Sequence, residues 1–167
     1  DITPEYPNLK ELITNMYETL EQSEGIGLAA PQIGLPIRLV IINLDLISDD
    51  LPEYKDYIRT FINPHIIEMD DTETDSMEEG CLSLPGIHEP VRRPTRIRVR
   101  YQDENFEEHE EWVTGYLARV MQHEFDHLEG KVFVDHLSML RKQMIKAKLS
   151  NLLKGNFRCS YKVKTKK

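Results

Sequence analysis

The segment Thr114–Gly130, with the sequence TGYLARVMQHEFDHLEG, predicts a helix on which the rest of the fold is built. Thr114 is a suitable N-cap residue, and Gly130 stands where a glycine commonly follows a helix. The apolar residues between them recur at helical spacing, so one side of the helix is expected to pack against a core. These apolar residues are Leu117, Val120, Met121, Phe125 and Leu128.

The centre of this helix reads His123-Glu124-Phe125-Asp126-His127. Residues four apart lie on one face about a turn apart, so both imidazoles can reach a single metal ion. Glu124 stands beside the first histidine, where a carboxylate can take a proton from a water that the metal activates. Two histidines and a glutamate also occur by chance, but here they lie inside a well-formed amphipathic pattern. The motif predicts a metal centre that hydrolyses a carbonyl–nitrogen bond.

Catalytic metal sites usually offer three protein ligands and keep one position for water. The residues themselves leave the third ligand open. The candidates are Cys81, Cys159, His136, His88 and the carboxylates. Cys81 follows Gly80 between turn residues, where a thiolate can approach a metal, although a cysteine there can equally be a small buried hydrophobe. Cys159 lies in a basic tail, which is a poor setting for a buried site.

Residues 25–32, with the sequence GIGLAAPQ, form a small and tightly turned segment that lets backbone approach a ligand closely. The segment is not a dinucleotide fingerprint, because no predicted strand precedes it and its spacing differs. It also lacks the Gly-Lys-Ser/Thr end of a phosphate loop. Gln32 offers an amide that can donate a hydrogen bond to an oxyanion, or it is simply exposed at a tight connection.

The remaining patterns predict an α+β fold in one domain, residues 1–167, because strands precede helices in blocks. The expected helices are Leu9–Leu20, ended by Gly25, and Leu137–Lys154. The expected strands are Ile37–Leu44, Thr60–Glu68, Arg96–Tyr101 and Glu108–Val113, the last two joined by a turn at Asp103–Asn105. Pro64 within a strand indicates an edge or a bulge. The polar segments Asp45–Asp56 and Asp70–Glu79 are expected to be loops.

The composition indicates a globular chain, with 40% hydrophobic and 30% charged residues and a net charge of −8. No apolar run approaches the roughly 18 residues of a membrane span, so no membrane association is expected. Two cysteines do not make a disulfide framework, which favours a reducing compartment and makes the cytoplasm the default. The chain begins at Asp1 rather than Met, so a targeting segment can have preceded it, and an organellar origin stays open.

Residues 136–167 contain no Asp or Glu and ten Lys or Arg, so the acidic charge lies in the preceding part of the chain. An acidic body repels nucleic acid, whereas a basic helix and tail at residues 137–167 would be attracted to RNA. The alternative is a solvated helix face with a frayed end. No DNA partner is expected.

Three segments together resemble the peptide deformylase family: Gly25–Gln32, Glu79–Ser83 and Gln122–His127. Their order and spacing match the family, and the resemblance covers about Leu9–Phe133. It implies antiparallel or mixed β-sheets packed around a central metal-binding helix, with a further C-terminal helix. It also implies a metal-dependent hydrolase that removes the formyl group from the N-formylmethionine of nascent polypeptides and releases formate.

The resemblance further implies that Cys81, His123 and His127 bind the metal, with water as the fourth ligand. Glu124 would be the general acid and base, and Gln32 and the backbone N–H of Leu82 would stabilise the oxyanion. The family's natural metal is Fe²⁺, which Zn²⁺ or Ni²⁺ often replaces in purified protein.

The resemblance also implies a substrate site. Tyr116, Arg119 and Val120 would line a pocket for the methionine side chain, with Arg119 contributing its aliphatic stem. Gly27 would offer backbone hydrogen bonds to the peptide as an added strand, and Ile26 and Gly80 would also belong to the substrate site.

Bacterial relatives with a long C-terminal helix can dock on the ribosome, and the basic tail suggests the same for this chain, as a monomer. The family commonly has a further segment before the first helix, which this sequence lacks.

Two other functions compete with this interpretation. A metalloprotease shares the His-Glu-x-x-His motif, but Cys81 and the glycine segment disfavour it. A ribosome- or RNA-binding protein with a structural metal would usually need a fourth Cys or His ligand, and none is obviously placed.

Overall fold

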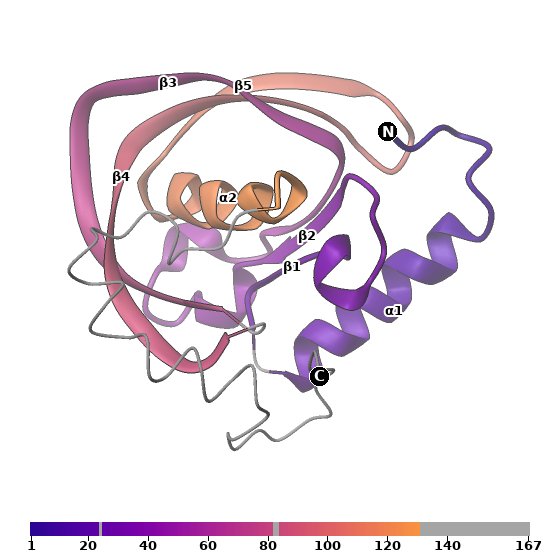
Figure 1. The fold of residues 1–167 in the computed structure, drawn as a ribbon, viewed down its shortest axis with the longest axis horizontal. Coiled ribbons are helices and arrows are strands. Elements are labelled where there is room, and N and C mark those ends of the chain that lie inside the picture. The colour runs from indigo at the N-terminus through magenta and orange to yellow at the C-terminus, as the bar shows by residue number, and fades with distance from the viewer. Residues whose placement is uncertain (24, 82–83, 131–167) are drawn as a thin grey trace.

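A five-stranded antiparallel sheet surrounds a helix in the computed structural model, which describes residues 1–23, 25–81 and 84–130 (Figure 1). The helices are α1 (Leu9–Gln22) and α2 (Gly115–Leu128), and the strands are β1 (Gly27–Ala29), β2 (Leu39–Asn43), β3 (Ile58–Cys81), β4 (Leu84–Gln102) and β5 (Glu108–Thr114). Short 3₁₀ turns occupy η1 (Ala30–Ile33), η2 (Asp45–Ile47) and η3 (Pro52–Tyr54). The strands lie in the order β1-β2-β3-β4-β5. The predicted α+β class and central helix are confirmed.

Strand β2 separates two hydrophobic cores, one on each face of the sheet. Val40 and Ile42 pack in the core around α2, whereas Leu39 and Ile41 pack in the core against α1. Alternate residues of a strand point to opposite faces, so a strand buried on both sides reads as a continuous apolar run. Figure 1 shows β3 and β4 bending around α2 while α1 lies outside the sheet. The predicted buried strand at Ile37–Leu44 is confirmed, with narrower bounds.

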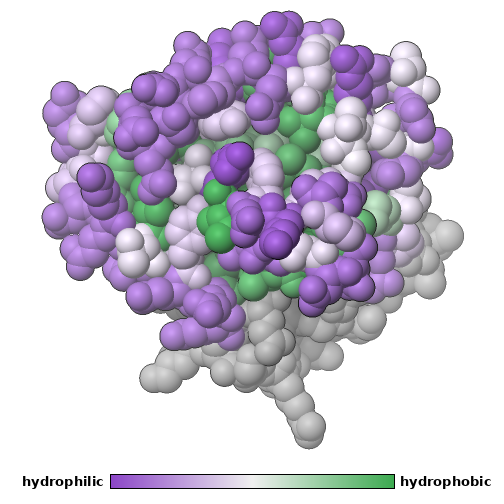
Figure 2. All heavy atoms as spheres, turned by 180° about the vertical axis from the view of Figure 1, so that it is seen from behind, coloured by the Kyte–Doolittle hydropathy of each residue, from purple (hydrophilic) through white to green (hydrophobic). Residues whose placement is uncertain are grey.

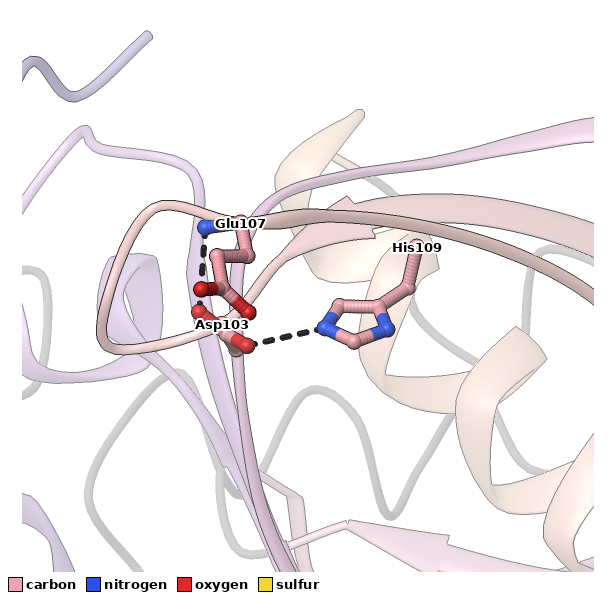
Figure 3. Close-up of side chains that lie close together, drawn as sticks. All are labelled: Asp103, Glu107 and His109. Atoms are coloured by element: carbon pink, nitrogen blue, oxygen red, sulfur yellow. Dashed lines mark hydrogen bonds and ion pairs between the residues drawn. The ribbon is translucent and has the colours of Figure 1, made fainter.

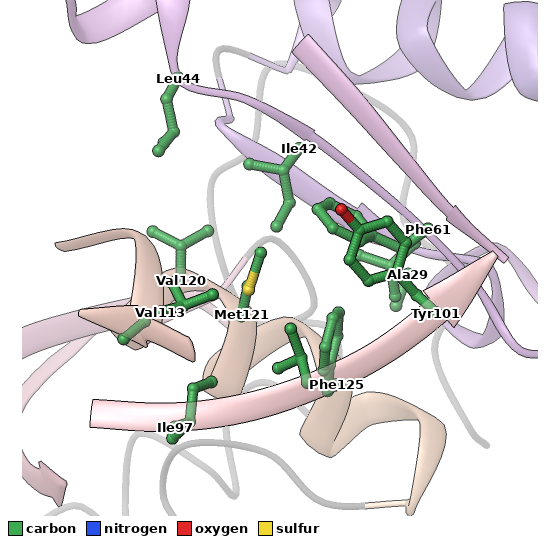
Figure 4. Packing of buried hydrophobic residues seen from close by; sticks show 13 residues of the cluster. Ala29, Ile42, Leu44, Phe61, Ile97, Tyr101, Val113, Val120, Met121 and Phe125 are labelled. Atoms are coloured by element: carbon green, nitrogen blue, oxygen red, sulfur yellow. The ribbon is translucent and has the colours of Figure 1, made fainter. Parts of the chain in front are cut away.

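Three aromatic rings pack among aliphatic side chains in the core between α2 and the sheet (Figure 4). Phe61 on β3 meets Tyr101 on β4 edge-to-face at 4.7 Å between ring centroids, and it meets Phe125 on α2 at 5.8 Å. Edge-to-face pairs of this kind add to the free energy gained by burial. Met121 and Ile97 are fully buried beside them. The core therefore fixes α2 against β3 and β4, and α2 carries the metal motif.

The acidic segment Asp70–Glu79 is part of β3, so the prediction of a surface loop there is wrong. Its residues pair across the ribbon with basic residues of β4, as in Asp70 with Arg96 and Asp75 with Arg93. Opposite charges on facing positions favour the pairing, although an exposed ion pair such as Asp70–Arg96, at 3.6 Å, adds little stability. A ribbon built from charge pairs has no alternating apolar pattern, which is why the sequence looked like a loop.

Several smaller predictions can be compared directly with the structure. The register of β3 and β4 shifts between Ile62 and His65, so Pro64 does mark a bulge. The hairpin of β4 and β5 forms as expected, but β4 is far longer than Arg96–Tyr101. Helix α1 ends at Gln22, before Gly25, with Ser23 as its C-cap. The predicted helix Leu137–Lys154 and the basic tail lie outside the described residues.

The surface is mainly hydrophilic on the face opposite to that of Figure 1, where hydrophobic side chains show as scattered groups between polar ones (Figure 2). Exposed large hydrophobic residues of the described chain are Ile33, Leu46, Ile58, Ile67, Met69, Met77 and Trp112. Arg96 covers one of them, since its guanidinium lies 4.0 Å from the ring centroid of Trp112. Neither described helix has the length and apolar character that crossing a membrane would require.

Candidate active site and metal centre

Helix α2 lies between Thr114 and Gly130, the two residues that the sequence predicted at its ends. Thr114 is the N-cap with extended backbone, but its side chain makes no cap hydrogen bond. The hydroxyl oxygen of Tyr54 instead accepts a hydrogen bond of 3.0 Å from the N–H of Leu117, so a side chain from η3 serves this helix end. At the other end, Gly130 has a φ of 75° and donates from its N–H to the carbonyl of His127.

The helix presents both histidines of the motif on one buried face. The ring centroids of His123 and His127 lie 5.4 Å apart with the rings inclined by 74°. Only 9% of His123 and 7% of His127 is exposed. Two nearly buried imidazoles one turn apart suit the binding of a single ion. The predicted juxtaposition of these two side chains is therefore present.

Glu79, near the end of β3, holds the first of these histidines. Its Oε1 lies 2.8 Å from Nδ1 of His123. If Nδ1 carries the proton and donates it to this carboxylate, Nε2 keeps its lone pair for a metal. Burial alone would raise the pKa of Glu79, but hydrogen bonds from His123 and Arg93 outweigh it and bring the pKa to about 2.

Arg93 of β4 connects Glu79 to the same helix. It donates from Nε and Nη2 to the two oxygens of Glu79, at 2.6 and 2.8 Å, and from Nη1 to Asp126 at 2.9 Å. A planar guanidinium suits this double contact with a carboxylate. Glu79 and Arg93 were not proposed as site residues, because the acidic stretch was taken for a loop. The position of Glu79 just before Gly80-Cys81 was the signal that could have identified it.

Glu124 lies against β1, where Gly27 leaves space for it. A Cβ built on Gly27 would come within 2.8 Å of Cγ and 2.9 Å of Oε1 of Glu124. Only 6% of Glu124 is exposed. The glycine segment and the metal motif, which the sequence separates widely, therefore meet at this point.

The side chain of Gln32 folds back on its own segment. Its Oε1 accepts a hydrogen bond of 2.8 Å from the N–H of Ala29. This bond fixes which end of the amide is the acceptor, so the NH₂ group is the end that can donate to a ligand. The orientation suits the donor role expected of Gln32.

The expected pocket residues have different surroundings. Val120 is buried in the core around α2, and Tyr116 is partly buried beside it. The guanidinium of Arg119 is turned to Glu79 and Asp75, so any contribution to a pocket comes from its stem. Ile26 is partly buried against the same core, and its carbonyl accepts a hydrogen bond from the N–H of Asn43 at 2.8 Å.

Some of the expected site lies outside the described residues. Cys81 is the last residue of β3, and the backbone of Gly80 pairs with that of His88, but the side chains of residues 80–89 are not described. The backbone N–H of Leu82 and the alternative ligands His136 and Cys159 also lie outside the described residues.

A second group of potential ligand atoms lies at the turn between β4 and β5 (Figure 3). Asp103 accepts hydrogen bonds from the N–H groups of Asn105 and Glu107, and its Oδ2 lies 2.8 Å from Nε2 of His109. These contacts close a tight turn. They account for the convergence of Asp103, Glu107 and His109 without a bound ion.

The chain is similar to known proteins over almost its whole length. The model of the polypeptide deformylase family matches residues 1–143. The peptide deformylase of Christiangramia forsetii is 46% identical over 171 residues, covering 98% of this chain and 87% of that protein. A solved structure of Plasmodium falciparum peptide deformylase has a TM-score of 0.83 at 34% identity, covering 93% of this chain and 87% of that one. For the Synechococcus elongatus peptide deformylase in complex with actinonin, the TM-score is 0.76 at 35% identity. The match covers 88% of this chain and 78% of that one.

A buried helix with two histidines and a glutamate, enclosed by an antiparallel sheet, is typical of a metal-dependent hydrolase. The chain belongs to the polypeptide deformylase family. Enzymes of this family remove the N-formyl group from nascent polypeptides, and this chain is a hydrolase of that type.

Proposed function

We propose that Cys81, His123 and His127 hold the divalent metal and that Glu124 carries the proton during deformylation. The observation that carries the proposal is the hydrogen bond between His123 and Glu79, which orients one imidazole for coordination through Nε2. Imidazole and thiolate together suit Fe²⁺ or Zn²⁺. When bound, the metal would lower the pKa of a water and polarise the formyl carbonyl.

In this proposal Glu124 moves one proton. As the water oxygen bonds to the formyl carbon, the carboxylate of Glu124 accepts the proton that the water loses. As the carbon–nitrogen bond then breaks, Glu124 passes that proton to the departing amine, leaving formate and a free N-terminus. The close packing of Glu124 on Gly27 supports this role, because it limits the positions that the carboxylate can take.

Gln32 and the N–H of Leu82 would stabilise the negative charge that builds on the formyl oxygen. For Gln32, the bond from Ala29 to Oε1 supports the role, because with Oε1 as the acceptor of this bond the NH₂ group is the donor end of the amide.

The outer edge of β1 would bind the substrate backbone. The bond from Asn43 to Ile26 makes these two residues a hydrogen-bonded pair in the register of β1 with β2. Pairs alternate along an antiparallel ladder, so the N–H and C=O of Gly27 are directed away from β2. They can pair with an extended peptide added at this edge. Ile26, Gly80, Tyr116, Val120 and the stem of Arg119 would complete the site for formylmethionine.

The metal, the cellular location and the oligomeric state are proposed from the resemblance to the family. We propose Fe²⁺ as the native metal, with Zn²⁺ or Ni²⁺ able to replace it, a cytoplasmic location and a monomeric state. We also propose that the basic helix and tail at residues 137–167 dock on the ribosome. Deleting residues 155–167, or reversing the charges of Lys142 and Lys146, should weaken ribosome binding at low salt, and unchanged affinity would refute the docking.

The deciding experiment measures formate release from formyl-Met-Ala-Ser by anaerobic protein loaded with Fe²⁺. We expect rapid release by the natural chain and its loss in Glu124→Ala, with the metal retained in that variant. Glu129→Ala removes an exposed carboxylate at the end of the same helix and should keep normal turnover. Release by Glu124→Ala would refute the proton-carrier role. If the natural chain releases no formate but cleaves an unformylated peptide internally, it is a protease instead.

A further inference from the structure

Arg119 occupies a position that the family resemblance assigns to the methionine pocket, yet its guanidinium contacts Glu79. Nη1 of Arg119 donates to Oε2 of Glu79 and, at 2.9 Å, to the carbonyl of Val91. Only 5% of Arg119 is exposed. A buried guanidinium with these partners contributes to the interior of the protein rather than to an open pocket wall.

Glu79 receives four hydrogen bonds, two on each oxygen. Oε1 is bonded by His123 and by Nη2 of Arg93, and Oε2 by Nε of Arg93 and by Arg119. Arg119 and His123 stand four residues apart on α2, on the same side of the helix. One carboxylate from β3 therefore connects two successive turns of α2, and Arg119 adds a further constraint to the two bonds from Arg93.

Arg119 is itself anchored on β3. Nη2 donates to Oδ1 of Asp75 at 2.6 Å and to the carbonyl of Asp75 at 3.0 Å. The side chain of Asp75 is half exposed, at 51%. The contacts thus run from a surface carboxylate through Arg119 and Glu79 to Nδ1 of His123. Each bond in this series constrains the direction of the next.

We propose that Arg119 is a positioning residue, anchored by Asp75, which fixes Glu79 and through it the coordinating orientation of His123. This inference rests on the proposed function, in which His123 is a metal ligand. Partners that orient a ligating histidine commonly contribute about 10- to 100-fold to metal affinity or activity. A pocket residue would instead affect the binding of the formylmethionine side chain. The two roles are therefore distinguished by metal affinity and by which of kcat and KM changes.

The test compares Arg119→Met and Asp75→Ala with the natural chain. Methionine keeps an unbranched apolar stem but removes the guanidinium, and Asp75 is exposed, so its variant should fold even if Arg119→Met does not. Zn²⁺ affinity is measured by competition with a chelator, and kcat and KM are measured with formyl-Met-Ala-Ser. We expect about tenfold weaker Zn²⁺ binding in Arg119→Met, a smaller loss in Asp75→Ala, and a lower kcat at unchanged KM in both.

Two controls sharpen the comparison. Asp75→Asn keeps an oxygen acceptor for Nη2 and should restore most of the Zn²⁺ affinity lost in Asp75→Ala. Glu73→Ala removes an exposed carboxylate two residues away on β3 and should leave Zn²⁺ affinity unchanged. In Zn²⁺-loaded protein, the Nδ1 proton of His123 should also exchange faster with solvent in Asp75→Ala, as followed by NMR.

Unchanged Zn²⁺ affinity in Asp75→Ala and in folded Arg119→Met would overturn the proposal, as would a raised KM at unchanged kcat. His123→Ala distinguishes this failure from failure of the proposed function. If His123→Ala binds Zn²⁺ as tightly as the natural chain, the ligand assignment itself is wrong.

Discussion

Gly27 of β1 lies so close to Glu124 of α2 that a single methyl group on Gly27 would occupy the space of the glutamate side chain. Glycine is required here by this close approach, since Gly27 does not have a positive φ. The identity of one residue thus determines where the Glu124 carboxylate can lie.

Gly27→Ala should therefore destabilise the protein and displace Glu124. Overpacking of this kind typically costs about 1–3 kcal/mol, and a displacement of about 1 Å can lower kcat by about 100-fold. Urea unfolding and formate release measure the two effects.

The double variant Gly27→Ala/Glu124→Ala tests the cause, because the shortened side chain leaves room for the methyl group. Its free energy of unfolding should exceed the value expected from adding the two single effects. Strict additivity would show that the loss in Gly27→Ala arises elsewhere.

Gln32→Glu separates the two ends of the Gln32 side chain. The carboxylate can still accept the hydrogen bond from Ala29, but it has no NH₂ donor and adds negative charge near the formyl oxygen. We expect nearly normal stability with kcat lowered by about 10²–10³. Gln32→Ala, which removes both ends, should lose kcat and also loosen the glycine segment. A Gln32→Glu enzyme with normal kcat would exclude Gln32 from oxyanion stabilisation.

Phe61 and Ile62 are neighbours on β3 that face different cores, so their variants should differ in function. Phe61→Ala should cost about 3–5 kcal/mol and Ile62→Ala about 2–5 kcal/mol in the free energy of unfolding. Only Phe61 contacts α2, through Phe125, and we expect Phe61→Ala alone to lower kcat under conditions where both proteins are folded. Equal kcat values in the two variants would contradict this division.

The raised pKa of Tyr17 predicts how the stability of the protein changes at alkaline pH. Burial raises its pKa to about 12, against the smaller opposing effect of its hydrogen bond with Thr60. An unfolded tyrosine has a pKa of about 10. The stability due to the neutral phenol is thus fully present below pH 10 and is lost as the pH rises toward 12.

Tyr17→Phe should be less stable than the natural chain at pH 7 by about 1 kcal/mol, because Thr60 loses a partner. The two curves of stability against pH should converge above pH 10. Urea unfolding at a series of pH values measures both, and parallel curves would rule out a raised pKa for Tyr17.

The parts of the site that the sequence predicted are those that depend on local spacing. His123, Glu124 and His127 follow from one helical pattern, and the buried strand β2 follows from one apolar run. The ribbon at Asp70–Glu79 was not predicted, because the arginines of β4 that face it lie elsewhere in the sequence. Glu79 was missed for the same reason, since its partners Arg93 and His123 come from two other elements.

The meeting of Gly27 and Glu124 also bears on the order in which the chain folds. Strands β3, β4 and β5 pair with their sequence neighbours, so this part of the sheet can form early. The contact between β1 and α2 joins segments near opposite ends of the described chain. Closing so large a loop costs conformational entropy, and contacts of this kind form slowly. The side chain of Glu124 packs against Gly27 only when that loop has closed. During refolding, the return of catalytic turnover should therefore lag behind the return of β-sheet signal, and it would report the final assembly step.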